Sequence, residues 1–161
     1  DAAACAREPV PEHFVFEMSE PRLRIVIPDA PAIRMGPHPL AAAQAHARFM
    51  GSDGKGGYSI SVLTPTADPG MGAKECASSL AVGLVRRYGL KREDVLARRP
   101  NDSTFVMLFA VKADPLLQLK AYLLSGSEGR CVEVHLSRNA AAKEDLAPWF
   151  RGFHNARIEI P

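Results

Sequence analysis

The sequence predicts an α+β fold: a mainly antiparallel sheet, made of a hairpin and a three-strand meander, packed with one long and one shorter helix as a layered sandwich. Three observations predict it. Apolar or alternating runs of strand length follow one another across short turns. Only one long segment carries a clear helical stripe. The 161 residues suit one domain, expected at 21–161 after an extended arm at 1–20 that is rich in Pro, Glu and Ala.

The first half of the domain is expected to hold one strand and one hairpin. At 22–27 apolar side chains alternate with basic ones until Pro28 ends the strand. Residues 51–57, GSDGKGG, form a turn cluster, and an alternating β-branched strand follows at 58–63. The alanine-rich segment before the turn has high helix propensity. Because a hairpin needs a strand on each side of its turn, we expect a strand at 44–51 that pairs with 58–63.

The clearest helix lies within residues 66–90. A set of its apolar residues falls on one stripe at helical spacing, and Lys74, Glu75, Ser79 and Arg86 face away from it. The stripe consists of Ala73, Ala77, Leu80, Leu84 and Tyr88. Gly89 follows the stripe directly and is expected to end the helix in a left-handed conformation. Cys76 is expected on the flank of the buried stripe.

The second half is expected to form the meander and the shorter helix. Apolar runs at 103–111, 116–125 and 131–138 are separated by tight turns, and the first is apolar on both faces, as in a central strand. Asp145 is suited to cap the shorter helix, which places Pro148 in the first turn, where proline is tolerated. The apolar stripe of this helix is Leu146, Trp149, Phe150 and Phe153.

Residues 156–160 are expected to add a short closing edge strand. The resulting order is a strand that ends in proline, a hairpin, a long helix, a meander and a C-terminal helix with aromatic anchors. This order resembles the PsbP-like superfamily over about residues 21–160. The resemblance rests on the order of elements and matches no functional residue of that family. It implies a small exported accessory or binding module.

Composition and termini narrow the function classes. A formal net charge of +2 and a pI near 8.5 are too mild to favour nucleic acid as a partner. The sequence holds no apolar run of the roughly 18 residues that a transmembrane helix needs. It begins at Asp1 with small residues and no initiator methionine, which favours a chain exported after removal of a signal peptide. We therefore expect a periplasmic or secreted protein.

Two further features leave alternatives open. The cysteines Cys5, Cys76 and Cys131 allow three possible disulfide pairings, and no CxxC motif is present. Six basic residues cluster between Arg86 and Arg99. This cluster suits either a solvated helix end or a surface that binds an anion or phospholipid.

One face of the expected sheet collects polar side chains, because alternate residues of neighbouring strands share a face. The set is His46, Arg48, Ser59, Ser61, Gln118, Lys120, Tyr122, Glu133 and His135. We expect no helix to cover such a face. The hypothesis is a non-catalytic accessory protein without a cofactor that binds a protein partner in the cell envelope. The expected contact residues are His135, Glu133, Tyr122, Lys120 and Arg48.

Two alternatives to partner binding use other side chains. A copper-binding accessory protein would use His38, His46, Met35 and Met50, since imidazole and thioether suit copper. A small hydrolase would use Ser137 and His135, with Glu133 on the same strand face. Consecutive same-face residues lie roughly 6.5–7 Å apart along a strand, too far for direct contact between a base and a nucleophile.

Overall fold

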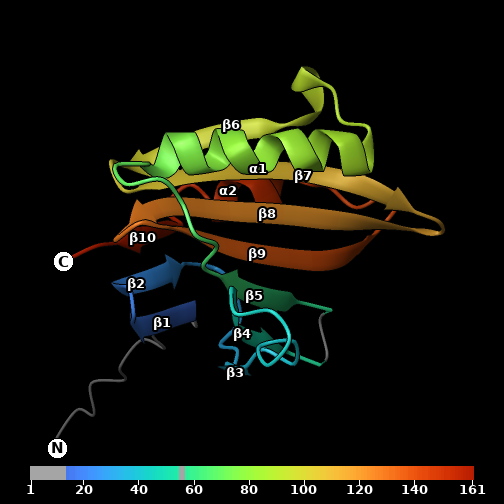
Figure 1. Ribbon diagram of the computed structural model, residues 1–161. Coiled ribbons are helices and arrows are strands. Elements are labelled where there is room, and N and C mark those ends of the chain that lie inside the picture. The colour runs from blue at the N-terminus through green and yellow to red at the C-terminus, as the bar shows by residue number, and fades with distance from the viewer. Residues whose placement is uncertain (1–13, 55–56) are drawn as a thin grey trace, which may run out of the picture.

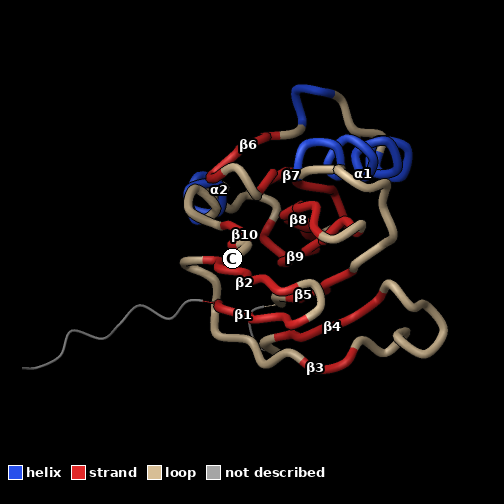
Figure 2. The backbone as a smooth tube through the Cα atoms, turned by 60° about the vertical axis from the view of Figure 1, so that its left-hand side comes forward, coloured by secondary structure: helices blue, strands red, loops and turns tan. Residues whose placement is uncertain are grey.

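The computed structural model describes residues 14–54 and 57–161. Two antiparallel sheets and two helices form three layers (Figures 1 and 2), which confirms the α+β prediction. The smaller sheet has the order β1-β2-β10, and its strands are β1 (Phe14–Ser19), β2 (Arg22–Ile27) and β10 (Arg157–Glu159). The larger sheet has the order β3-β4-β5-β9-β8-β7-β6. Its strands are β3 (Gly36–Pro37), β4 (Ala47–Ser52), β5 (Ser59–Leu63), β6 (Leu96–Asn101), β7 (Thr104–Ala113), β8 (Leu116–Ser127) and β9 (Arg130–Ala141).

The expected hairpin is confirmed. β4 pairs with β5 in antiparallel register, and the segment at 39–43 forms turns instead of a helix. β4 begins at Ala47, three residues later than expected, and a bulge between Ala47 and Phe49 shifts its register. At the turn, the backbone N–H of Asp53 donates to the carbonyl of Tyr58 at 3.3 Å.

The three-strand meander is confirmed as β7, β8 and β9, and β5 joins the hairpin to it by pairing with β9. Two strands were not expected. β6 forms the far edge of the larger sheet beside β7. β1 lies within the expected arm and pairs with β2, so the boundary placed at residue 20 falls between two paired strands.

The main core lies between the two sheets. Phe14, Ile25 and Ile27 of the smaller sheet face the apolar side of the meander, and α2 (Ala147–Gly152) closes one end with Trp149. Its fully buried members include Leu119, Leu123 and Leu136 of the meander. The first turn of α2 contains proline as expected, and Asp145 accepts the backbone N–H of Ala147 at 3.0 Å.

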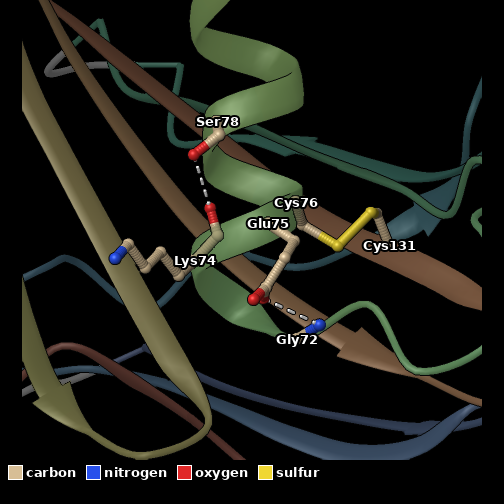
Figure 3. The surroundings of a disulfide bond; sticks show 6 residues. All are labelled: Gly72, Lys74, Glu75, Cys76, Ser78 and Cys131. Carbon is tan, nitrogen blue, oxygen red and sulfur yellow. Dashed lines mark hydrogen bonds between the residues drawn. A yellow bond between two sulfur atoms is a disulfide. The ribbon is translucent and has the colours of Figure 1, made fainter.

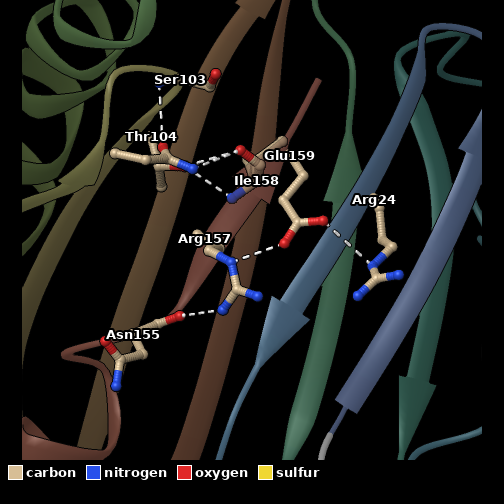
Figure 4. Close-up of polar contacts among 8 residues, drawn as sticks. Arg24, Ser103, Thr104, Asn155, Arg157, Ile158 and Glu159 are labelled. Carbon is tan, nitrogen blue, oxygen red and sulfur yellow. Dashed lines mark hydrogen bonds and ion pairs between the residues drawn. The ribbon is translucent and has the colours of Figure 1, made fainter. Parts of the chain in front are cut away.

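A polar contact joins the sheets. The Thr104 hydroxyl of β7 donates to the carbonyl of Ile158 at 3.1 Å and accepts the N–H of the same residue at 2.7 Å (Figure 4). Both residues are fully buried, so each bond satisfies a group that water cannot reach. On the outer side of β10, Glu159 accepts from Arg157 and pairs with Arg24 at 3.4 Å.

The long helix α1 (Ala73–Tyr88) matches its prediction, and Gly89 caps it with a φ of 62°. α1 lies across β7 and β8 on the side of the larger sheet opposite to β1 and β2 (Figures 1 and 2). This is the face that carries Tyr122 and His135, so the expectation that no helix would cover it is wrong. The reason is that β7 carries apolar side chains along most of this face, whereas β8 and β9 carry them at one end, and α1 packs on these side chains.

The start of α1 is fixed by a disulfide and a close approach. Cys76 and Cys131 are bonded with an Sγ–Sγ distance of 2.09 Å, which joins α1 to the beginning of β9 (Figure 3). Glu75 accepts the backbone N–H of Gly72 at 3.1 Å. The loop before the helix crosses β8 at Gly126, where a Cβ atom would overlap the carbonyl of Met71. Cys5 lies outside the described residues.

Candidate polar pocket beneath the end of helix α1

A small polar pocket lies between the C-terminal end of α1 and the strands β5, β8 and β9. Its volume is about 180 Å³. The pocket lining is Ser59, Ser61, Arg87, Tyr88, Lys120, Tyr122, His135, Leu136 and Ser137. Five of these belong to the polar set expected from the sequence, so the structure brings together most of the predicted contact residues.

Strand register explains this grouping. Tyr122 on β8 lies opposite His135 on β9, which lies opposite Ser61 on β5. One step along the same face, Lys120 lies opposite Ser137. Directly opposed side chains have Cβ atoms about 4.5–5.5 Å apart, so each row brings its side chains within reach of one another.

Two cations flank one aromatic ring in this pocket. The guanidinium of Arg87 lies 5.2 Å from the ring centroid of Tyr88, and the ammonium of Lys120 lies 6.0 Å from the same centroid. Neither cation belongs to any ion pair within 14–54 and 57–161. The pocket therefore carries two positive charges that no described carboxylate neutralises.

Burial changes the acid–base properties of the pocket. Desolvation lowers the pKa of Lys120, and the nearby charge of Arg87 lowers it further. Desolvation raises the pKa of Tyr122, and interactions with Tyr88, including a hydrogen bond, add to the rise. The Tyr122 hydroxyl is thus neutral at physiological pH. An anion placed beside Lys120 would favour its charged form.

The histidine of the pocket is held from two sides. Its Nε2 atom lies 3.0 Å from Oε1 of Glu133, which is mostly buried. The ring of His135 packs edge-on against Tyr122 with 4.7 Å between centroids. A carboxylate and a ring contact together fix the orientation of the imidazole.

Arg48 and His46 of the expected set are not in this pocket. Arg48 extends toward the β1–β2 turn, where it donates to the carbonyl of Glu20 at 3.1 Å and lies 5.7 Å from the ring centroid of Phe49. His46 is exposed and precedes the first residue of β4. The bulge in β4 breaks the simple alternation from which the sequence placed these two residues on the polar face.

The four residues of the copper hypothesis are not assembled around one point. Met50 lies opposite Ser61 on the pocket face of the sheet, whereas Met35 packs against the main core on the other face. The Nδ1 atom of His38 accepts the backbone N–H of Leu40 at 3.1 Å. Among the residues that the structure describes, no three His, Cys, Asp or Glu side chains are grouped to hold a metal ion.

A larger cavity of about 400 Å³ lies beside α2, and sequence reasoning did not propose it. Asp29, Arg151 and Arg138 are its charged lining residues. The guanidinium of Arg138 lies 5.8 Å from the ring centroid of Tyr58 and 5.4 Å from that of Trp149. Two hydrogen bonds join this guanidinium to the carboxylate of Glu144. Asp29 in the lining and Glu144 beside Arg138 give this cavity one carboxylate for each of its two guanidinium groups, so it has a smaller excess of positive charge than the pocket under α1.

The sequence did not assign Arg87 and Tyr88 to the site. The sequence did place Tyr88 on the buried stripe of the long helix, which was the one indication that this residue faces the sheet. Because Tyr88 ends this stripe and follows two arginines, the end of the helix brings polar groups to the part of the sheet that it covers. The error was to assume that the helix and the polar strand residues lie on different faces.

Comparison with known proteins assigns no family. The sequence matches no family model, and no curated protein is significantly similar to it. None of the helices in the described part of the chain has the length and apolar character to cross a bilayer. The Cys76–Cys131 disulfide is consistent with an oxidising compartment outside the cytoplasm.

Proposed function

We propose that this protein is an exported, non-catalytic binding protein that engages a protein partner in the cell envelope through the pocket under α1. The partner supplies a carboxylate, from an acidic side chain or a chain terminus, which enters between Arg87 and Lys120. The hydroxyls of Ser59, Ser61 and Ser137 surround that position and are suited to donate further hydrogen bonds.

The observation that supports this proposal most directly is that Arg87 and Lys120 have no carboxylate partner among the residues that the structure describes. Desolvation lowers the pKa of Lys120, and repulsion from the like charge of Arg87 lowers it further. A bound carboxylate removes this repulsion and accepts charge-assisted hydrogen bonds. The relief of the repulsion between Arg87 and Lys120 therefore contributes favourably to the free energy of binding.

The disulfide supports a periplasmic or secreted location, because structural disulfides persist in oxidising compartments and are rare in the cytosol. A role as an accessory module is also what the resemblance to the PsbP-like superfamily implies. That resemblance stays a prediction from the order of elements, since no family model matches the chain.

A hexaglutamate peptide provides a defined probe for the test, with binding measured by isothermal titration calorimetry at about 0.05 M salt. Loss of charged hydrogen bonds in an Arg87→Gln/Lys120→Met variant is expected to weaken binding by at least about tenfold. The matched control is Arg86→Gln, which removes an exposed positive charge of the same helix outside the pocket. An equal loss in the control would show that net charge, and not the pocket, attracts the peptide.

A hydrolase is the second candidate, and one observation favours it. Glu133 and His135 are hydrogen-bonded at 3.0 Å, and Ser61 lies directly across from that histidine on β5. This cross-strand serine is closer to the geometry of a nucleophile than Ser137, which lies two residues along the same strand. Hydrolysis of p-nitrophenyl acetate that Ser61→Ala or Ser137→Ala abolishes would support catalysis. A rate unchanged in both variants would exclude it.

A further inference from the structure

An apolar groove lies on the same face of the larger sheet as the polar pocket, at the other side of α1. It has a volume of about 340 Å³, which lies within the usual size of small-molecule sites, above about 300 Å³. α1, the segment after it and the strands β6 and β7 form its walls. The residues on which the argument depends are Ala81, Val85, Arg92, Ala97 and Met107.

The groove is lined almost entirely by apolar side chains. Met107 and Phe109 of β7 form its floor, and Leu84 of α1 and Val95 of the following segment contribute to its sides. Val85 remains 46% exposed at the edge of the groove. Apolar surface left open to water is a cost that an apolar ligand would remove.

One charged residue lines this groove. Arg92, in the short 3₁₀ helix Arg92–Asp94, is exposed and takes part in no ion pair among the described residues. Two acidic residues follow it in the chain, and the carboxylate of Asp94 accepts the backbone N–H of Lys91 at 2.8 Å. The guanidinium is therefore available to a group that reaches the end of the groove.

We propose that this groove binds a free single-chain fatty acid, with its alkyl chain between α1 and the β6–β7 hairpin and its carboxylate at Arg92. The groove supplies the two features such a molecule needs: an apolar wall and, at Arg92, a cation that has no ion-pair partner in the described part of the chain. This assignment gives a role to part of the basic cluster at 86–99, which the pocket under α1 does not use beyond Arg87. The site is independent of the proposed partner-binding function.

Chain length is the first test. Octanoate, decanoate and dodecanoate are titrated below their micelle-forming concentrations in a calorimeter. Burial of one methylene group changes affinity by about fourfold, so two methylenes raise it by roughly fifteenfold until the groove is filled. An affinity that does not change from octanoate to dodecanoate would overturn the proposal, because the alkyl chain would then lie outside the groove.

Head-group charge is the second test. Arg92→Gln is expected to weaken dodecanoate at least about tenfold and to leave dodecan-1-ol unchanged, because only the carboxylate uses the guanidinium. Arg86→Gln is the matched control and should leave both ligands unchanged. Equal binding of dodecanoate and dodecyltrimethylammonium would overturn the proposal, since a site with an arginine discriminates between opposite charges.

Blocking the groove separates this site from other occupants. Ala97 is exposed on β6 and lines the groove, so Ala97→Phe fills the site from an accessible position and should abolish dodecanoate binding. Far-UV circular dichroism of that variant checks that the fold is kept. If sedimentation velocity instead shows a dimer that Ala97→Phe dissociates, a second copy of the chain occupies the groove. Co-sedimentation with phosphatidylglycerol vesicles that Arg92→Gln abolishes, without binding of free dodecanoate, would also overturn the proposal.

Discussion

Removal of the Cys76–Cys131 bond is expected to cause a large loss of stability. The change is Cys76→Ala/Cys131→Ala in a Cys5→Ser background, so that no third thiol takes part in exchange. The two bonded cysteines are 55 residues apart in the chain, and both are buried. The bond therefore closes a long loop that would otherwise be free in the unfolded state.

The size of the loss follows from loop length. A cross-link lowers the entropy of the unfolded chain by an amount that grows with the logarithm of the loop, and a loop of this size corresponds to about 4 kcal/mol at 25 °C. In a protein of 161 residues, each 1 kcal/mol shifts the thermal midpoint by roughly 2–4 °C. The double variant is therefore expected to melt about 8–16 °C below the cross-linked protein.

Urea unfolding followed by circular dichroism measures the free energy of unfolding. The control is the Cys5→Ser protein with its disulfide reduced, which loses the cross-link but keeps both sulfur atoms in place. Thiol alkylation and mass spectrometry confirm the redox state of each sample. A difference below about 1 kcal/mol between the oxidised and reduced forms would refute the loop-entropy reasoning.

Three other outcomes are expected. Gly126→Ala should cost more than about 3 kcal/mol of stability in urea unfolding, because its Cβ would overlap the loop before α1, whereas Gly36→Ala has open space and should stay within about 0.5 kcal/mol. Lys120→Met should raise the thermal midpoint by about 2 °C at pH 7. The pKa of Lys120 is lowered in the folded state, so the stability of the unmodified protein should rise as pH increases toward 10.5. This rise should vanish in the variant. A thermal midpoint that is lower in the variant at pH 7 would contradict the destabilisation assigned to this cation. The bond from Arg138 lowers the pKa of Glu144, so its stabilisation is fully present above pH 4.5 and is lost as pH falls through the lowered pKa. Glu144→Gln should remove less than about 1 kcal/mol at pH 7 and progressively less as pH falls below 4.5, as measured by urea unfolding.

The sequence predicted the elements with regular periodicity. The helical stripe ending at Tyr88 is α1, and the three apolar runs are β7, β8 and β9. The hairpin prediction also held against the alanine content of its first strand, because a turn cluster followed by an alternating strand fixes the partner. These elements carry their information locally, in spacing and turn residues.

β6 could not be predicted in the same way. Its sequence, LARRPN, contains adjacent arginines and a proline, and it becomes a strand because β7 offers it a partner edge. β1 was hidden for a different reason, since FVFEMS follows directly on a segment rich in proline and alanine. In both strands the deciding contribution is tertiary pairing, which local propensity does not contain.

The sequence indicated the polar residues of this face, but it did not indicate that α1 covers part of the same face. Along β8, Leu124 and Tyr122 are buried under α1 on the same face on which Lys120 lies at the pocket. A strand of twelve residues is long enough for one face to change from apolar to polar partway along. Treating each face as uniform therefore led to the wrong position for the helix and left Arg87 out of the site.

The outermost strands of the larger sheet determine how the molecule meets copies of itself. One boundary is β3, which is two residues long, and the other is β6, which presents Arg99 to solvent and contains Pro100. The short edge strand β3 offers few free backbone groups for pairing. On the opposite edge, the proline and the charged side chain of β6 disfavour pairing with an incoming strand. Neither end of this seven-stranded sheet is therefore a good template for the addition of a strand from another molecule, which disfavours fibril growth through it at high protein concentration.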